Sequence, residues 1–189
     1  MDRMIPGRGD RGLTLVELMV TLVVLSITLV VGAPALQRLI HGNQLRAEAG
    51  RLVTAINLAR SEAIIRNLPV SLCPSSTAAA GTATCAGEYA GGWIVFSNAD
   101  RDRVVDEGTD ELIRVFEPIP PGYTLTNRAG TRGVSDLITY LPDGSSRRNR
   151  TLLVCAPLER GTRGWSIVLN MVGRVRVSAG EGQCPASVT

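Results

Sequence analysis

The first strong pattern along the chain is an apolar run that follows a short, polar and arginine-bearing start. Residues 1–12 read MDRMIPGRGDRG, and the residues from Leu13 to Leu36 are almost all apolar. As a helix with a rise of about 1.5 Å per residue, this run can cross a hydrocarbon layer about 30 Å thick. Because basic flanks stay in the cytoplasm, the pattern predicts a single membrane-spanning helix over 13–36 with the rest of the chain outside the cytoplasm.

Helical periodicity continues after the apolar run and predicts an amphipathic continuation of the helix over 37–68. Apolar residues recur at spacings of three and four, which places them on one face that should pack on a globular head. The stripe consists of Leu45, Ala49, Leu52, Ile56, Ala59 and Ala63. Glu48 with Arg51, and Glu62 with Arg66, form charge pairs that we expect on the polar face.

Pro69 should end this helix, since the residue before a proline avoids the α conformation. Short β-like runs bounded by turn residues follow. They are Val70–Cys73, Gly92–Ser97, Glu111–Glu117, Tyr123–Thr126, Leu137–Leu141, Leu152–Cys155, Trp165–Asn170 and Arg174–Val177. Many closely spaced strands without a second long helix predict a mainly antiparallel β head over 69–189, and hence the α+β class.

Two features of the N-terminal segment bear on how it is processed. A secretory signal cut after Ala33-Pro34-Ala35 and an uncleaved anchor are both compatible with its composition. The apolar run is longer than the 7–15 residues or so of an ordinary signal peptide. It also contains Glu17, and an acid in such a run is costly without a partner.

The segment GLTLVEL, residues 12–18, resembles the cleavage motif of type IV pilins and pseudopilins. The resemblance implies that a prepilin peptidase removes residues 1–12, cutting between Gly12 and Leu13 and methylating the new N-terminus. Leu13 departs from the family's usual phenylalanine. Glu17 and Pro34 fall at the family's acidic and helix-bending positions, and the resemblance implies that both act in assembly. Glu17 would lie about 6 Å from the mature amino group, and we expect it to pair with that group of a neighbouring subunit.

Further blocks, in order, resemble the GspH/FimT family of minor pilins and pseudopilins. They are NLARSEA (57–63), VSLC (70–73), GWIVF (92–96), LIRVF (112–116) and VGRVRV (172–177). The resemblance implies a pilin-like fold, in which a long helix packs on a β-sandwich-like head. It also implies an inner-membrane protein with its head in the periplasm. Its partners would be other pilins in a type IV pilus or pseudopilins in a type II secretion system.

The four cysteines fit an oxidising compartment. Three pairings are possible, and locality favours Cys73 with Cys85 and Cys155 with Cys184. A zinc site is disfavoured because there is no C-x-x-C spacing and no nearby histidine. We therefore expect no metal and no cofactor.

Enzymatic residues are sparse in this chain. The single histidine, His41, lies on the expected helix and supplies no catalytic triad, and no phosphate-cradling glycine loop stands between a strand and a helix. A run from Asn98 resembles the start of a calcium loop, but Arg103 and Thr109 replace its glycine and its glutamate. We therefore expect a solvated acidic hairpin between the strands Gly92–Ser97 and Glu111–Glu117. We also expect that the protein is not an enzyme.

All basic residues are arginines, and the charge is lopsided, with acids between residues 100 and 117 and arginines between 128 and 176. In a strand, Arg174 and Arg176 should point to one face. Further arginines stand in two expected loops: Arg147, Arg148 and Arg150 in one, and Arg160 and Arg163 in the other. Gathered in space, these side chains would bind the phosphates of a nucleic acid.

The Gly-Arg-x-Arg pattern of residues 173–176 is similar to the DNA-binding motif of FimT-type minor pilins. The resemblance implies uptake of extracellular double-stranded DNA, held by its backbone without sequence preference, with Arg174 and Arg176 as the first contacts. In the alternative, these arginines pair with acidic loops of neighbouring subunits, and the chain is a purely structural priming pseudopilin. A secreted β-domain protein cut after Ala35 is a second alternative.

Overall fold

The structure is a computed structural model that describes residue 12 and residues 14–77, 80–157, 164–180 and 182–185. One long helix, α1 (Leu15–Arg66), is followed by eight strands. The chain divides into two compact units, Met1–Leu39 and Ile40–Thr189. The first unit therefore holds the apolar part of α1, and the second holds the rest of α1 together with the head.

Local chemistry explains both ends of α1. Thr14 precedes the helix, and its Oγ1 accepts a hydrogen bond of 3.2 Å from the backbone N–H of Glu17, as an N-cap does. The helix ends at Arg66, two residues before the predicted end, because Asn67 adopts a left-handed conformation with φ of 52°. Pro34 lies inside the helix, which continues through it.

The apolar side chains of the first unit are exposed. All the large apolar residues from Leu15 to Leu36 that are described are exposed. α1 is the one helix among the described residues that is long and apolar enough to cross a membrane. This is consistent with the membrane-spanning helix that the sequence predicts, because a lipid layer would cover such a surface.

Two four-stranded antiparallel sheets build the head. The first has the order β3-β2-β1-β5, and the second has the order β4-β6-β7-β8. The strands of the first sheet are β1 (Val70–Pro74), β2 (Trp93–Ser97), β3 (Leu112–Phe116) and β5 (Ile138–Tyr140). Those of the second are β4 (Thr124–Asn127), β6 (Arg150–Cys155), β7 (Trp165–Leu169) and β8 (Val175–Ala179). All eight predicted strands are present with shifted ends, and the α+β fold is confirmed.

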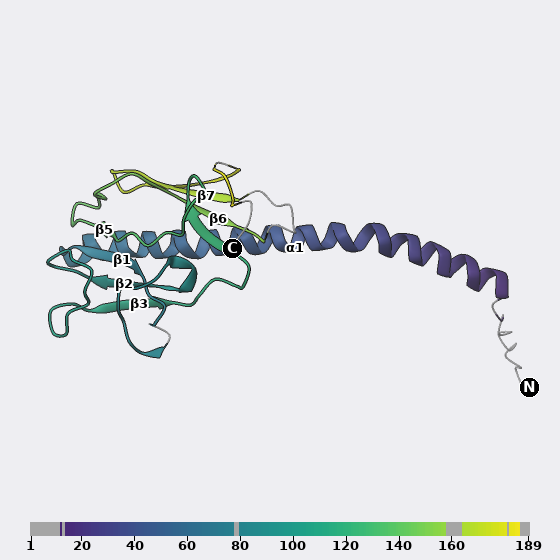
Figure 1. Cartoon of the computed structure of the whole chain (residues 1–189), viewed down its shortest axis with the longest axis horizontal. Helices are drawn as coiled ribbons and strands as arrows, with labels where there is room; N and C mark the ends of the chain where they lie inside the picture. The colour runs from purple at the N-terminus through teal and green to yellow at the C-terminus, as the bar shows by residue number, and fades with distance from the viewer. Residues whose placement is uncertain (1–11, 13, 78–79, 158–163, 181, 186–189) are drawn as a thin grey trace, which may run out of the picture. The chain divides into compact units, whose positions relative to one another are not determined.

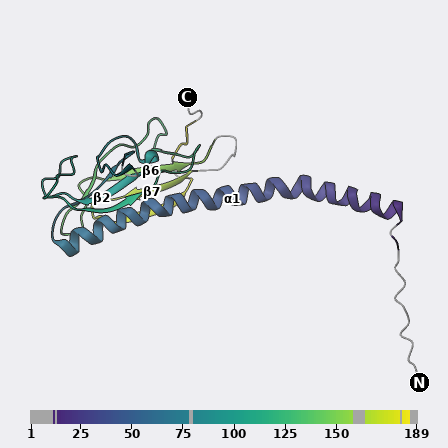
Figure 2. The same cartoon turned by 90° about the horizontal axis from the view of Figure 1, so that it is seen from below.

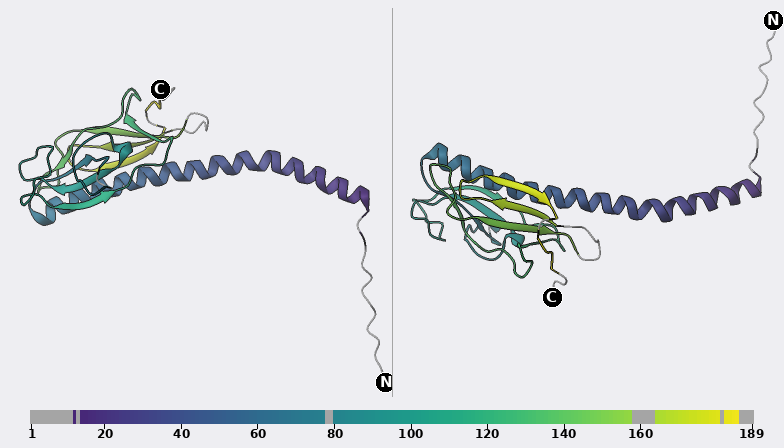
Figure 3. Two further views of the ribbon diagram at one scale, coloured as in Figure 1. Left: turned by 60° about the horizontal axis from the view of Figure 1, so that its bottom comes forward. Right: turned by 90° about the horizontal axis from the view of Figure 1, so that it is seen from above.

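The C-terminal half of α1 packs against both sheets. Figure 1 shows β1, β2 and β3 on one side of this half of the helix and β6 and β7 on the other. In Figures 2 and 3 the strands lie on one side of this half of the helix. The predicted stripe is fully buried there, with Leu52 and Ile56 at 0% exposure. It joins Leu72 of the first sheet and Ile167 of the second in one core.

One predicted surface residue is buried. Glu48 was expected on the polar face of the helix, but only 7% of it is exposed. Its carboxylate forms an ion pair of 2.6 Å with Arg51, which donates a second hydrogen bond to the backbone carbonyl of Glu117. The Arg51 guanidinium also lies 5.3 Å from the centre of the Trp93 ring. Through Arg51, the ion pair therefore connects the helix to the chain that follows β3 of the first sheet and does not lie on the solvent-exposed face of the helix.

Two disulfides fasten the head, and they have the pairing that locality favoured. Cys73 on β1 bonds to Cys85, which closes the small loop before β2. Cys155 at the end of β6 bonds to Cys184, which holds the C-terminal segment against the second sheet.

Candidate functional site

The residues expected to direct processing and assembly lie at the start of α1. Gly12 is exposed and precedes the helix, whereas Leu13 and residues 1–11 lie outside the described residues. Glu17 stands in the first helical turn with its side chain exposed. Sequence reasoning missed the cap at Thr14, although the Thr-x-x-Glu spacing is a recognised start signal. The acid at position 17 therefore also suits the positive end of the helix dipole.

The two arginines of the Gly-Arg-x-Arg pattern lie on the β7–β8 hairpin. Arg174 precedes β8, and its backbone N–H donates to Oδ1 of Asn170 at 2.8 Å. Arg176 lies within β8, opposite Val168 of β7. Both arginines are exposed, while the intervening Val175 packs against the core, as alternation along an extended chain requires.

Gly173 is required by packing. Its φ is 81°, and an added Cβ would come within 2.0 Å of the carbonyl oxygen of Gly144. The buried hydroxyl of Tyr140 donates to the Gly173 carbonyl at 3.2 Å. Burial raises the pKa of Tyr140 to about 12, so this hydroxyl stays a donor at neutral pH. The glycine thus lets the hairpin turn lie directly on the neighbouring loop.

That neighbouring loop, residues 143–149, carries two more of the predicted arginines. The backbone N–H of Ser146 donates to the carbonyl of Met171, and Asn149 Oδ1 accepts from the N–H of Met171 at 2.7 Å. Arg147 and Arg148 are exposed on this loop. The structure therefore places the 143–149 loop and the Arg174 turn side by side.

Arg150 was expected in a turn, and that expectation is wrong. It is the first residue of β6, where it pairs with Leu169 of β7. Its Nη1 forms an ion pair of 2.8 Å with Asp136, and its Nη2 donates to the carbonyl of Leu137 at 2.9 Å. The strand fixes the backbone of Arg150, and these two contacts hold its guanidinium group in place. Arg160 and Arg163 lie outside the described residues.

Arg147, Arg148 and Arg150 line a cavity of about 300 Å³. Two arginines that sequence reasoning assigned to the acidic region, Arg101 and Arg103, line the same cavity. Arg174 and Arg176 do not line it. No sequence signal links residues 101–103 with residues 147–150, because only the pairing of the strands brings the two segments together.

The loop after β2 also carries the acids that resembled a calcium loop. Oxygen atoms of Asp100, Asp102 and Asp106 lie within 4.8 Å of one another. Burial raises the pKa of Asp106, and the charges of Asp102 and Asp100 raise it further. Asn98 is fully buried and donates to Ser71 and to the Asp102 carbonyl, so its amide supports the loop from inside. The solvated hairpin that we expected forms between β2 and β3, apart from this buried anchor.

Comparison with known proteins identifies the family. The model of the type II transport protein GspH family matches residues 48–173, which is well over half of the chain. The prokaryotic N-terminal methylation motif matches residues 7–33. No curated protein matches the chain in sequence.

Solved structures of two other proteins match the chain. The type IV minor pilin FimU of Pseudomonas aeruginosa superposes with a TM-score of 0.54 at 16% identity, covering 74% of this chain and 95% of that one. The minor pseudopilin EpsH of the type 2 secretion system of Vibrio cholerae gives a TM-score of 0.46 at 13% identity, covering 72% of this chain and 97% of that one. The family match over the head, together with the methylation motif at the start of the apolar helix, shows that this chain belongs to the GspH family of minor pilins and pseudopilins.

Proposed function

We propose that this chain is a non-enzymatic filament subunit of the bacterial inner membrane, matured by prepilin peptidase between Gly12 and Leu13. The observation that carries the proposal is the coincidence of the methylation motif with an uncovered apolar helix. After cleavage, α1 would leave the membrane and pack among the helices of other pilins or pseudopilins. The head would stand in the periplasm, where both disulfides are stable. We assign it no catalytic residue and no cofactor.

N-terminal sequencing and intact mass of the chain, made in cells with and without prepilin peptidase, test this maturation. We expect an N-methylated Leu13 only when the peptidase is present, and an unprocessed chain for Gly12→Val. A mature end at Leu36, independent of the peptidase, would instead establish the alternative of a secreted β-domain protein.

We propose that Glu17 and Pro34 act in assembly. Glu17 lies exposed in the first turn, where a neighbour's methylated amino group can reach its carboxylate. Glu17→Gln keeps the backbone N–H that Thr14 caps and removes only the charge. The variant should be inserted and cleaved normally but lost from sheared filaments. Pro34→Ala tests the helix interior in the same assay, and Thr14→Ala is the control for helix capping alone. Normal incorporation of Glu17→Gln would contradict the proposed pairing.

We propose a second activity, capture of double-stranded DNA by its phosphates. It is supported by exposed arginines on two hydrogen-bonded segments: Arg147 and Arg148 on one, and Arg174 with the nearby Arg176 on the other. Backbone contacts of this kind carry no sequence preference. DNA uptake would then be a role of the assembled filament.

Binding of a fluorescent duplex to the full chain in neutral-detergent micelles, at two salt concentrations, tests this activity. We expect affinity that falls steeply with salt and does not depend on sequence. Arg174→Gln/Arg176→Gln should weaken it at least tenfold, whereas Arg128→Gln/Arg132→Gln removes equal charge elsewhere on the exposed surface and should have little effect. Absence of binding at low salt would leave the purely structural pseudopilin.

A further inference from the structure

The arginine cavity is an electrostatically unbalanced part of the head. We use this name for the cavity lined by Arg101, Arg103, Arg147, Arg148 and Arg150, together with Asp136, Leu137, Thr139 and Ser146. Five guanidinium groups thus share about 300 Å³ with one lining carboxylate. Arginine keeps its charge at every physiological pH, so these groups cannot relieve their repulsion by losing protons.

Contacts within the head balance only part of the positive charge of the arginine cavity. Arg150 is paired with Asp136, and Arg103 donates to the backbone carbonyl of Ser135 at 2.8 Å. Among the residues that the structure describes, Arg101, Arg147 and Arg148 form no ion pair with any carboxylate. The acids of the loop after β2, Asp100, Asp102 and Asp106, do not line the cavity. The cavity therefore retains a surplus of positive charge.

Buried hydrogen bonds lie beneath Thr139, one of the residues that line the cavity. Thr139 Oγ1 and Ser71 Oγ lie 2.8 Å apart, and Ser71 Oγ accepts from the side-chain amide of Asn98 at 2.9 Å. All three residues are buried. The same Asn98 amide donates to the Asp102 carbonyl, so this hydrogen-bonded chain fixes the backbone that carries Arg101 and Arg103. A buried polar network that is fully bonded holds a surface loop in one arrangement before any ligand arrives.

Arg101 adds an independent observation. It has a φ of 65°, and among described non-glycine residues only Asn67, at the end of α1, shares a positive value. The left-handed region is unfavourable for a long side chain, and glycine or asparagine would adopt it with less strain. An arginine held in this conformation at the edge of a cationic cavity points to a use for its side chain, because strained residues gather at ligand sites.

We propose that the arginine cavity binds a compact, multiply charged phosphate anion, a phosphate or diphosphate group. A single carboxylate would neutralise only one of the surplus charges, whereas a diphosphate can neutralise several. Guanidinium groups also match phosphate oxygens in pairs. The cavity's size is at the lower end of the range for small-molecule sites, which fits such a group. The cavity shares Arg147 and Arg148 with the proposed DNA contact and goes beyond it through Arg101, Arg103 and Arg150. It stands whether or not DNA binds at Arg174 and Arg176.

Thermal unfolding of the full chain in neutral-detergent micelles, at constant ionic strength, tests the proposal. Inorganic pyrophosphate should raise the unfolding midpoint progressively with concentration, since a ligand that binds only the folded state stabilises it. Acetate at the same ionic strength should not. A parallel titration with a nucleoside 5′-diphosphate identifies the source of the group. An equal shift means that the cavity accepts a diphosphate carried by a larger molecule, and no shift means that it accepts only the free anion.

Two variants locate the effect. Arg101→Gly removes one guanidinium and the backbone strain together, so it should fold at least as stably without anion and need at least tenfold more pyrophosphate for the same shift. Arg147→Gln/Arg148→Gln should lose the shift. Arg128→Gln/Arg132→Gln and Arg174→Gln/Arg176→Gln should keep it, and the second of these separates this site from the DNA contact at Arg174 and Arg176. Equal shifts with pyrophosphate and acetate, or a pyrophosphate shift that survives the cavity variants, would overturn the proposal.

Discussion

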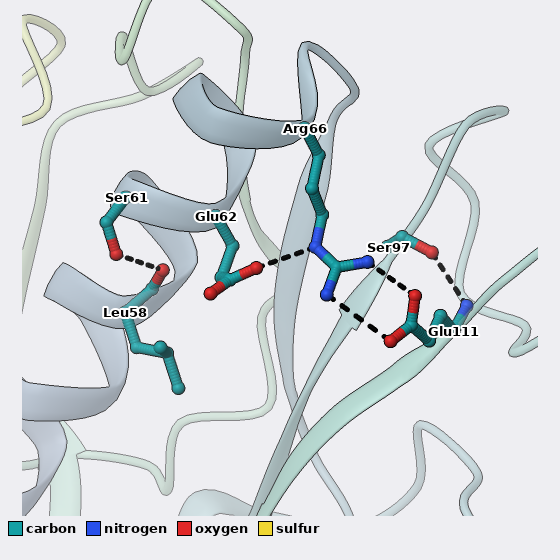
Figure 4. Close-up of polar contacts among 6 residues, drawn as sticks. All are labelled: Leu58, Ser61, Glu62, Arg66, Ser97 and Glu111. Atoms are coloured by element: carbon teal, nitrogen blue, oxygen red, sulfur yellow. Dashed lines mark hydrogen bonds and ion pairs between the residues drawn. The ribbon is translucent and has the colours of Figure 1, made fainter.

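Arg66, the last residue of α1, forms a bidentate ion pair with Glu111, which directly precedes β3 (Figure 4). The same guanidinium donates from Nε to Glu62 at 2.6 Å, one helical turn earlier. The backbone N–H of Glu111 is held in turn by Ser97 Oγ of β2 at 2.7 Å. A charge pair that the sequence predicted within the helix thus extends to the first sheet and connects the end of the helix to it.

This ion pair predicts sensitivity to acid. Hydrogen bonds from Arg66 hold the pKa of Glu111 below its ordinary value. The unfolded chain therefore takes up this proton first as the pH falls. The stabilisation is complete above the ordinary glutamate pKa of about 4.3 and is lost as the pH falls through the folded value. Urea unfolding followed by the fluorescence of the head's two tryptophans at pH 7 and pH 3.5 measures the loss.

The variant Glu111→Gln should be less stable than the wild type at pH 7 and should lose less stability between the two pH values. Glu107→Gln, a change at another exposed glutamate, is its matched control. Identical pH dependence in Glu111→Gln and the wild type would show that the pair with Arg66 contributes nothing to stability.

Gly173→Ala should destabilise the head by about 2–3 kcal/mol, because the new Cβ must displace the 143–149 loop in addition to adopting a positive φ. Gly108→Ala measures the cost of the positive φ alone, since Gly108 has a φ of 89° and nothing lies within 4 Å of an added Cβ. Its cost should be about 1 kcal/mol. Equal losses for the two variants in urea unfolding would contradict the close approach of Gly173 to Gly144.

Removal of each disulfide should weaken the head by different amounts. The chain-entropy account gives about 3 kcal/mol for a short loop. Cys155 and Cys184 are 29 residues apart, against 12 for Cys73 and Cys85, so their loop adds roughly 0.8 kcal/mol. Urea unfolding of Cys73→Ala/Cys85→Ala and of Cys155→Ala/Cys184→Ala checks the order. A larger loss from the short loop would mean that native packing, rather than loop closure, sets the difference.

Leu52→Ala tests the packing of α1 on the sheets. Leu52 is 0% exposed, and its loss should leave a cavity that costs about 3 kcal/mol in urea unfolding. Ile65 lies on the same helix but is 76% exposed, so Ile65→Ala should change stability by less than about 0.5 kcal/mol. Similar losses for both variants would mean that the helix packs on the head through a different face.

Much of the fold follows from local pattern in the sequence. The stripe from Leu45 to Ala63 repeats at the period of a helix, and every member is buried against the sheets. The strand positions follow from short apolar runs between turn residues, and the favoured disulfide pairing needs only proximity along the chain. The expected acid at Glu17 and the cleavage motif are equally local. Such features are predictable because neighbours in sequence determine them.

The tertiary structure decides which charged side chains lie close together in the head. Sequence order divides the head into an acidic part and a basic part, and this division separates Arg101 and Arg103 from Arg147 and Arg148. In the fold, β1 pairs with β2 on one side and with β5 on the other, so Val70 lies opposite both Ser97 and Tyr140. The loop after β2 and the loop after β5 therefore leave the sheet close together. The burial of Glu48 also depends on tertiary structure, since its partner Arg51 donates to the carbonyl of Glu117, which lies far away in the sequence. Helix and strand periodicity act over a few residues, whereas strand pairing joins segments far apart, so only the folded chain shows which arginines share one cavity.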